Sequence, residues 1–254
     1  MSGPDKMTRL LVVNPNTTQA VTEAFLAEAR RIAPADVAMD GATGHYGAPI
    51  VSIEAENIIA SHVALEILAA RGRSYDAAIL AISFDSGLVA AREIMPIPVI
   101  GITEAALLAA MAAGERIGVV SFGQVSVPLY RRLLHAYRMQ DKVAGWEVVE
   151  VYAASGILDS QAQDAAVVEA ICRLEDCGAG AVAILGTAMV GVGRRLQPLV
   201  RASIFDGAAP SIEAALAAIR AGRCAERTFL PLSRCHGVPS GLADLIAGSA
   251  PPAT

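Results

Sequence analysis

Short apolar runs alternate along the chain with longer stretches in which apolar residues recur at helical spacing. Each run is rich in β-branched residues, alanine or leucine and is bounded by turn residues, a pattern typical of buried strands. These runs predict strands over 8–13, 36–40, 77–82, 98–103, 116–120, 146–152, 181–185 and 203–205. The helical spacing predicts helices over 19–32, 52–71, 88–93, 104–113, 128–139, 161–177, 193–200, 211–221 and 242–247. The alternation indicates an α/β fold, with mostly parallel sheets flanked by helices.

Two distant segments repeat the same pattern. Residues 79–88 (ILAISFDSGL) and 182–192 (VAILGTAMVGV) are apolar runs that end in a small hydroxyl residue, Ser83 or Thr187, followed within a few positions by glycine. Each is typical of a buried strand that delivers one side chain to its carboxyl end. A site between two such strands would have Ser83 on one side and Thr187 on the other.

The repeat extends to an earlier pair of strands. The run 10–13 is followed by Asn14, and the run 117–120 is followed by Ser121. Asn14 precedes Ser83 by about as many residues as Ser121 precedes Thr187. The repeat predicts two similar lobes related by a pseudo-two-fold axis, with the site between them. We expect a first lobe of residues 7–104 plus 208–247, a second lobe of 105–207, and flexible tails at 1–6 and 248–254.

The carboxyl ends of parallel strands are where ligands bind in such sheets, and side chains near these ends each allow two interpretations. Ser83 either reacts with a ligand or hydrogen-bonds its own loop. Asn14 and Asn16 bind a substrate carbonyl, form an Asx-turn before the next helix, or do both. Asp85 either assists a hydroxyl or caps the helix that follows Ser86 and Gly87.

Two further places carry polar candidates. Glu104 follows a predicted strand and is either a cleft carboxylate or an acidic residue in the first turn of a helix. The glycine-rich stretch 41–49 is expected to be a loop, and loops of this kind often line sites. His45 and Tyr46 within it are candidates to cover a ligand.

Composition narrows the class of protein. Hydrophobic residues make up 54% of the chain and aromatic residues 4%, so alanine, valine, isoleucine and leucine must form the core. Mean hydropathy is +0.48, yet no apolar run reaches the roughly 18 residues of a membrane span. The first residues lack the features of a signal peptide, which favours a cytoplasmic location. A net charge of −5 without a basic block argues against nucleic acid as a partner.

Cysteine and histidine spacing gives no sign of a metal or disulfide framework. Cys172, Cys177, Cys224 and Cys235 form no CxxC pair and are expected to be free thiols. Cys172 and Cys177 fall on a predicted helix, where we expect them in the core. The four histidines form no HExxH pattern, so a metal site has no support from the sequence.

The ordered motifs resemble the aspartate/glutamate racemase superfamily, and within it the hydantoin and allantoin racemase branch. The similarity runs from about residue 8 to residue 220. It is carried by 13–18 (VNPNTT), 84–88 (FDSGL) with 91–93 (ARE), 98–106 (PVIGITEAA) and 184–188 (ILGTA). The resemblance implies an isomerase that needs no cofactor, acts on a small molecule and forms a homo-oligomer. It further implies two cysteines, one per lobe, that remove and return a proton on opposite faces of an acidic carbon.

This sequence departs from that pattern at both thiol positions. The first matches Ser83, or Ile82 if the alignment has no gap, and the second matches Thr187. An alcohol has a far higher pKa than the roughly 8.5 of a thiol, so a serine and threonine pair is a weaker acid–base couple. We interpret the two unlike residues as natural divergence rather than deliberate replacement.

The resulting prediction is a racemase-like isomerase of a hydantoin-type cyclic amide or ureide, or of an amino-acid derivative, with Ser83 and Thr187 as the catalytic pair. A hydrolase or decarboxylase on the same scaffold, or a binding protein without turnover, is the alternative. The expected substrate contacts are Asn14, Asn16, Phe84, Ser121, Phe122, Gly186 and Ala188.

Overall fold

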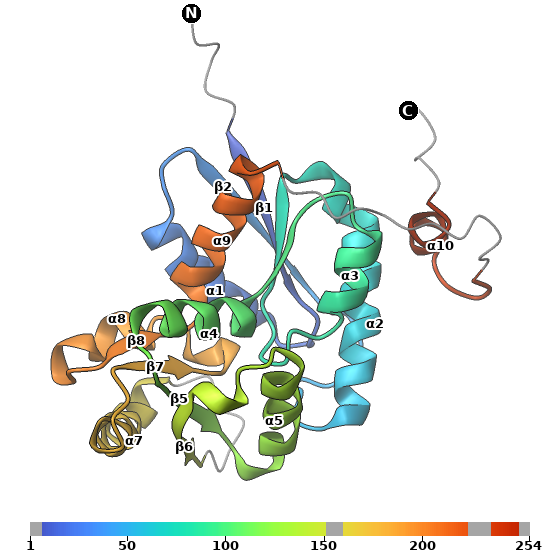
Figure 1. Cartoon of the computed structure of the whole chain (residues 1–254). Helices are drawn as coiled ribbons and strands as arrows, with labels where there is room; N and C mark the ends of the chain where they lie inside the picture. Colours follow the sequence, from blue (N-terminus) through green and yellow to red (C-terminus); the bar gives the residue numbers. More distant parts are fainter. Residues whose placement is uncertain (1–6, 151–159, 223–234, 249–254) are drawn as a thin grey trace, which may run out of the picture.

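The protein consists of two parallel four-stranded sheets with helices packed around them (Figure 1). The computed structural model describes residues 7–150, 160–222 and 235–248. The first sheet has the order β2-β1-β3-β4, formed by β1 (Thr8–Asn14), β2 (Val37–Thr43), β3 (Ala77–Leu80) and β4 (Val99–Gly101). The second has the order β6-β5-β7-β8, formed by β5 (Ile117–Phe122), β6 (Val143–Val149), β7 (Ala181–Ile184) and β8 (Ser203–Phe205). The predicted α/β class with two similar lobes is therefore confirmed.

The two sheets share their strand register as well as their order. Val13 of β1 pairs with Leu80 of β3, and Val120 of β5 pairs with Ile184 of β7. The next backbone bond is also repeated, because the N–H after β3 donates to Val13 and the N–H after β7 donates to Val120. The repeat seen in the sequence is thus a repeat of hydrogen-bonded structure.

The central strands β1 and β3 of the first sheet are buried on both faces, which explains why they contain continuous apolar runs. Alternate residues enter different clusters. Val12 and Ile79 pack with Phe25 of α1 (Gln19–Ile32), whereas Val13 and Leu80 pack with Leu68 of α2 (Glu54–Arg71). Helix α9 (Ala208–Arg220) packs beside α1 on the same face of the first sheet. The chain therefore returns to the first lobe after β8.

The remaining helices of this lobe lie around the same sheet. They are α3 (Leu88–Ile94), which packs against α2, and α10 (Ser240–Ile246), which also contacts α2. Helix α4 (Ile102–Ala113) starts directly after β4 and packs against α9 and against β7 and β8 of the second sheet. It therefore connects the two lobes.

The second sheet is enclosed by α5 (Val127–Ala136), α7 (Asp164–Asp176) and α8 (Val192–Leu196). One apolar cluster runs from Leu80 of the first sheet to Ile117 and Ala183 of the second, and includes Leu134 of α5. The lobes thus share a core. The boundaries predicted for them, and for the tails, remain a prediction. In the described part of the chain, no helix is both long and apolar enough to cross a membrane.

Several predicted elements differ in extent. The strand expected over 98–103 is shorter, because helix α4 begins at Ile102. The weak strand at 36–40 extends to Thr43, into the stretch expected to be a loop. The helix expected over 193–200 ends at Leu196 and continues as a 3-10 turn. The strand expected over 146–152 begins at Val143 and ends at Val149, and its last predicted residues lie outside the described ranges.

The expected burial of two cysteines was wrong. Cys172 and Cys177 are both exposed. Helix α7 turns Val167, Ile171 and Leu174 toward the core, and this spacing turns Cys172 away from it, whereas Cys177 follows the last helical residue as the C-cap of α7. Cys235 is also exposed and free, and Cys224 lies outside the described residues.

Candidate functional site

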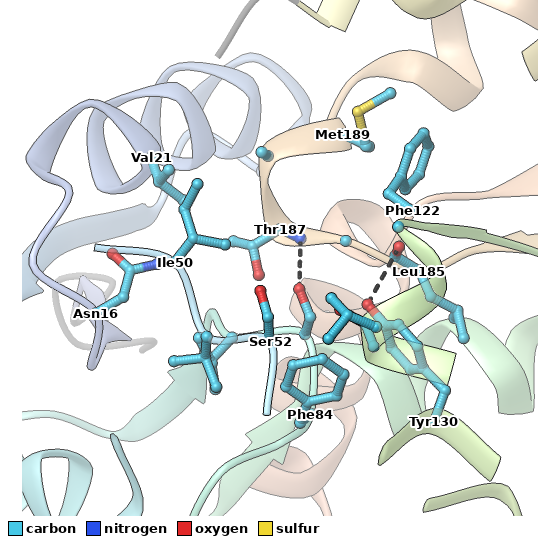
Figure 2. Close-up of a pocket in the computed structure, with 18 residues that line it drawn as sticks. Asn16, Val21, Ile50, Ser52, Phe84, Phe122, Tyr130, Leu185, Thr187 and Met189 are labelled. Atoms are coloured by element: carbon cyan, nitrogen blue, oxygen red, sulfur yellow. Dashed lines mark hydrogen bonds between the residues drawn. The ribbon is translucent and has the colours of Figure 1, made fainter. Parts of the chain in front are cut away.

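A pocket of about 160 Å³ lies between the carboxyl ends of the two sheets. Both predicted hydroxyl residues line it, together with five of the seven predicted contacts. Its lining residues are Asn16, Val21, Ile50, Val51, Ser52, Ile82, Ser83, Phe84, Phe122, Gly123, Val125, Ser126, Tyr130, Leu185, Gly186, Thr187, Ala188 and Met189 (Figure 2).

Ser83 and Thr187 occupy equivalent positions in the two lobes. Each lies three residues beyond a register-matched strand residue, Leu80 or Ile184. The Thr187 backbone N–H donates a hydrogen bond of 3.2 Å to Ser83 Oγ (Figure 2). Although Ile82 also lines the pocket, it is Ser83 that matches Thr187 by register. The two lobes therefore bring the predicted pair into direct contact.

Hydrogen bonds to the first turn of α4 hold the loop that carries Ser83. Thr103 Oγ1 donates to the Ser83 carbonyl at 2.6 Å. Asp85 Oδ1 and Oδ2 accept from the backbone N–H groups of Thr103 and Glu104 at 3.1 and 2.8 Å. Asp85 adopts a φ of 48°, and a Cβ on Gly101 would lie 2.4 Å from its carboxyl carbon. The close approach of this carboxylate to the backbone thus requires glycine at that position.

The Asp85 side chain caps α4. One of its two predicted roles was to cap the helix after Gly87, and that prediction was wrong, because α3 has no side-chain cap among the described residues. Tyr137, at the end of α5 in the second lobe, donates to Asp85 Oδ2 at 2.7 Å. Asp85 is 4% exposed, and burial raises its pKa to about 7, while the bonds from Tyr137 and the backbone oppose this rise. The nearby charge of Glu104 also raises this pKa. Glu104 itself pairs with Arg92 and lies away from the pocket, in the first turn of α4.

The tip that carries Thr187 is built differently. Gly186 has a φ of 151°, and Thr187 begins a 3-10 turn, Thr187–Met189. Thr187 is 3% exposed. Within the described part of the protein, its Oγ1 is buried without a hydrogen-bond partner. A buried polar group without a hydrogen-bond partner lowers the stability of the folded protein by about 1–3 kcal/mol. This hydroxyl is therefore suited to bind a polar atom of a ligand.

Tyr130 is a site residue that sequence reasoning missed. It comes from α5 and is 3% exposed, and its hydroxyl donates to the Leu185 carbonyl at 3.3 Å (Figure 2). Burial raises its pKa, whereas a side-chain hydrogen bond with Ser83 lowers it. Its ring packs on Phe84 at a centroid distance of 4.6 Å. Its position in an amphipathic helix was typical of core residues, so no sequence signal marked it.

The two predicted asparagines have different roles. Asn14 is fully buried and does not line the pocket; its Nδ2 donates to Asn16 Oδ1, the Thr18 carbonyl and Thr22 Oγ1. Its Oδ1 accepts from the Asn16 N–H, which completes the Asx-turn. Asn16 does line the pocket, and its side-chain nitrogen lies on the side of Ile50 (Figure 2). Asn14 therefore orients Asn16.

The remaining predicted contacts divide in the same way. Phe84, Phe122, Gly186 and Ala188 line the pocket. Ser121 does not, because it lies on β5 with its Oγ accepting from the Trp146 indole N–H at 2.8 Å.

The glycine-rich stretch contributes less to the pocket than the residues just after it. His45 and Tyr46 are exposed and absent from the lining, and their rings contact each other at 4.8 Å. Ile50, Val51 and Ser52 line the pocket instead, and no motif in the sequence marked them for this role.

The pocket is chemically neutral. Tyr130 is the only lining residue with an ionisable side chain among those described, and the polar remainder is hydroxyl, amide and backbone. No three His, Cys, Asp or Glu residues of the described ranges gather into a group that could hold a metal. Such a pocket can hold a small uncharged ligand by hydrogen bonds and apolar contact.

Proteins with similar sequences include known racemases. The model of the family described as Asp/Glu/Hydantoin racemase matches residues 10–215. The hydantoin racemase of Rhizobium meliloti is 28% identical over 216 residues, which cover 83% of this chain and 88% of that protein. The hydantoin racemase of Pseudomonas sp. (strain NS671) is 26% identical over 221 residues, covering 85% of this chain and 87% of that protein.

A solved structure extends the likeness to the fold. The allantoin racemase from Klebsiella pneumoniae superposes with a TM-score of 0.85 at 27% identity, covering 92% of this chain and 98% of that one. The family match spans most of the chain, including both strand tips and the pocket between them. The chain belongs to the Asp/Glu/Hydantoin racemase family.

Proposed function

We propose that the protein is a racemase-type isomerase that transfers protons at the acidic carbon of a small cyclic amide or ureide of the hydantoin type. The observation that carries the proposal is the meeting of two register-matched hydroxyl tips, Ser83 and Thr187, at one pocket of a racemase-family fold. Hydroxyl residues at both tips make the protein a slow member of this class.

An uncharged substrate suits the lining better than a free amino acid. No lysine, arginine or histidine is among the described lining residues, so a bound carboxylate would lack a cationic partner. The aromatic rings of Phe84 and Phe122 offer apolar surface to a ring substituent. A cavity of about 160 Å³ restricts the ligand to a compact molecule.

The polar groups are placed to hold the ring and the enolate that forms when its proton leaves. Asn16 offers side-chain N–H donors, and the unpartnered Thr187 hydroxyl offers both a donor and an acceptor. Hydrogen bonds that strengthen as charge develops on a carbonyl oxygen stabilise the transition state. The site thereby acidifies the carbon, which partly offsets the weakness of its hydroxyl bases.

The test is proton exchange measured by NMR in heavy water with single enantiomers of several 5-substituted hydantoins. The wild-type protein is compared with a Ser83→Cys, Thr187→Cys double variant. We expect slow exchange by the wild type and exchange faster by about 10²-fold or more in the double variant, because a thiol is a better acid–base group near neutral pH. No exchange by either protein would contradict the proposal.

The neutral lining also favours a second candidate, a binding protein without turnover, since no described lining residue is a base at neutral pH. Thermal stabilisation by a hydantoin without exchange would support that candidate. Product mass tests for a hydrolase or a decarboxylase, because hydrolysis adds water and decarboxylation removes carbon dioxide.

A further inference from the structure

The short segment from Ser83 to Asp85 is hydrogen-bonded at both ends by one residue of helix α4, Thr103. Thr103 Oγ1 donates to the Ser83 carbonyl at 2.6 Å, and the Thr103 N–H donates to Asp85 Oδ1 at 3.1 Å. Thr103 is 2% exposed and is absent from the lining of the pocket. It therefore acts on a bound ligand only through the loop that it holds.

The second lobe has no equivalent side-chain bond. In the first sheet Gly101 is the partner of Leu80, and Thr103 follows it by two residues. The register of β7 with β8, continued by one residue, places Asp206 at the position equivalent to Gly101. Ala208 is therefore equivalent to Thr103. Its N–H still donates to a carboxylate, that of Asp206, at 3.3 Å, but alanine has no hydroxyl to hold the other strand tip.

We propose that Thr103 is a positioning residue for the proton transfer, which it serves by fixing the Ser83 hydroxyl relative to the acidic carbon of the substrate. This inference rests on the proposed function and deepens it. Ser83 Oγ accepts from the Thr187 N–H, so a fixed Ser83 loop also sets where the two strand tips meet (Figure 2). Proton transfer needs its two atoms within hydrogen-bond reach, and a displacement of about 1 Å can slow a reaction about 100-fold.

Thr103→Val tests the role of the hydroxyl, because valine keeps the shape of the side chain. The Ser83 carbonyl loses its donor, whereas the backbone bond from residue 103 to Asp85 remains. We expect kcat for proton exchange to fall at least about tenfold, with a change of less than about twofold in the dissociation constant of the substrate. Thr103→Ser keeps a hydroxyl at the same place and should recover most of the lost rate.

The control is Ser211→Ala, which removes a buried hydroxyl at a distance from the Ser83 loop. Ser211 is fully buried in α9, and its Oγ donates to the Ala208 carbonyl at 2.9 Å. It is absent from the pocket lining. Its loss should lower stability in urea denaturation about as much as Thr103→Val does, and should leave both kcat and affinity unchanged.

The experiment uses one 5-substituted hydantoin that the wild type binds, at a temperature where every variant is folded. NMR in heavy water measures exchange, and titration measures the dissociation constant. Thr103→Ala removes the same hydroxyl with a smaller side chain and replaces Thr103→Val if that variant does not fold. A fall in kcat for either variant, with recovery in Thr103→Ser, is the expected result.

Two other results would overturn the positioning role while exchange by the wild type still supports the proposed function. One is an unchanged kcat without the Thr103 hydroxyl, whether or not affinity falls. The other is a loss of kcat in Ser211→Ala that matches the loss in Thr103→Val, because the rate would then follow stability alone. Absence of exchange by a wild-type protein that binds the hydantoin would overturn both the positioning role and the proposed function.

Discussion

The loops that follow β3 and β7 share the same strand register, but different hydrogen bonds hold them in place. Beyond β3, Asp85 ties the Ser83 loop to the start of α4 and to Tyr137 of the other lobe. Beyond β7, the comparable acidic anchor is Asp206, which follows the edge strand β8 and accepts from the backbone N–H groups of Gly191, Gly193 and Ala208. The difference teaches that a repeated fold can keep strand register while assigning its loop contacts independently.

The anchoring also separates the roles of the two lobes. Asp85 lies two residues from Ser83 and contacts both lobes, so it links the position of one hydroxyl to the lobe interface. Asp206 holds the start of α8, farther along the chain from Thr187, and these three backbone donors lie in or next to the first turns of α8 and α9. Variants at both anchors, and at the contacts between the lobes, test this contrast.

The largest effect is expected for Asp85→Ala. It leaves the Thr103 and Glu104 N–H groups and the Tyr137 hydroxyl without their acceptor, and should lower the free energy of unfolding by about 3 kcal/mol. Urea denaturation measures this loss. Asp206→Ala is the matched comparison, because Asp206 also accepts three hydrogen bonds but none from Tyr137. A larger loss of stability for Asp206→Ala than for Asp85→Ala would contradict the view that the bond between the lobes adds to the stability that Asp85 provides.

A pH dependence should follow from the same carboxyl group. The pKa of Asp85 is about 7 in the folded protein, against an ordinary value of 3.8, because burial disfavours its charged form. The folded state therefore binds this proton more tightly than the unfolded state. Its stabilising contribution is full below the ordinary pKa and is lost as pH rises through about 7.

The comparison with Asp85→Asn isolates this contribution, because the amide stays neutral at every pH. Urea denaturation between about pH 4 and pH 8 should show the wild type losing stability relative to the variant as pH rises. Parallel stability curves for the two proteins would show that the pKa of Asp85 is not raised.

A smaller effect is expected for Tyr137→Phe, which removes one bond to the Asp85 carboxyl and keeps the ring. We expect a loss of about 1–2 kcal/mol in the free energy of unfolding, measured by urea denaturation. In an Asp85→Ala background the same change should cost less, since its partner is already absent. Equal costs in both backgrounds would contradict direct coupling.

The smallest effect is expected for Arg132→Ala, which breaks an exposed ion pair between Arg132 of α5 and Glu54 of α2. This contact also joins the lobes, but both side chains are about half exposed, and solvent screens the pair. The change in stability should stay below about 1 kcal/mol and shrink further in high salt. A loss as large as that of Tyr137→Phe would mean that surface charge, and not the buried contact, holds the lobes together.

The sequence by itself determined the architecture and the pair of residues at its centre. Apolar runs ending in Ser83 and Thr187 predicted two matched strand tips, because strands buried on both faces leave a strong signal and their carboxyl ends meet at one edge. The local Asx-turn at Asn14 was also readable, since it depends on neighbours two residues away.

Only the tertiary structure decided which polar groups reach the pocket. Tyr130 and Ser52 enter it from α5 and from the segment before α2, whereas Asn14 and Ser121 are turned into the interior. Such assignments depend on contacts between residues far apart in the chain. The bond from Tyr137 to Asp85 and the missing partner of Thr187 Oγ1 within the described residues are of the same kind, because both arise from how the two lobes meet.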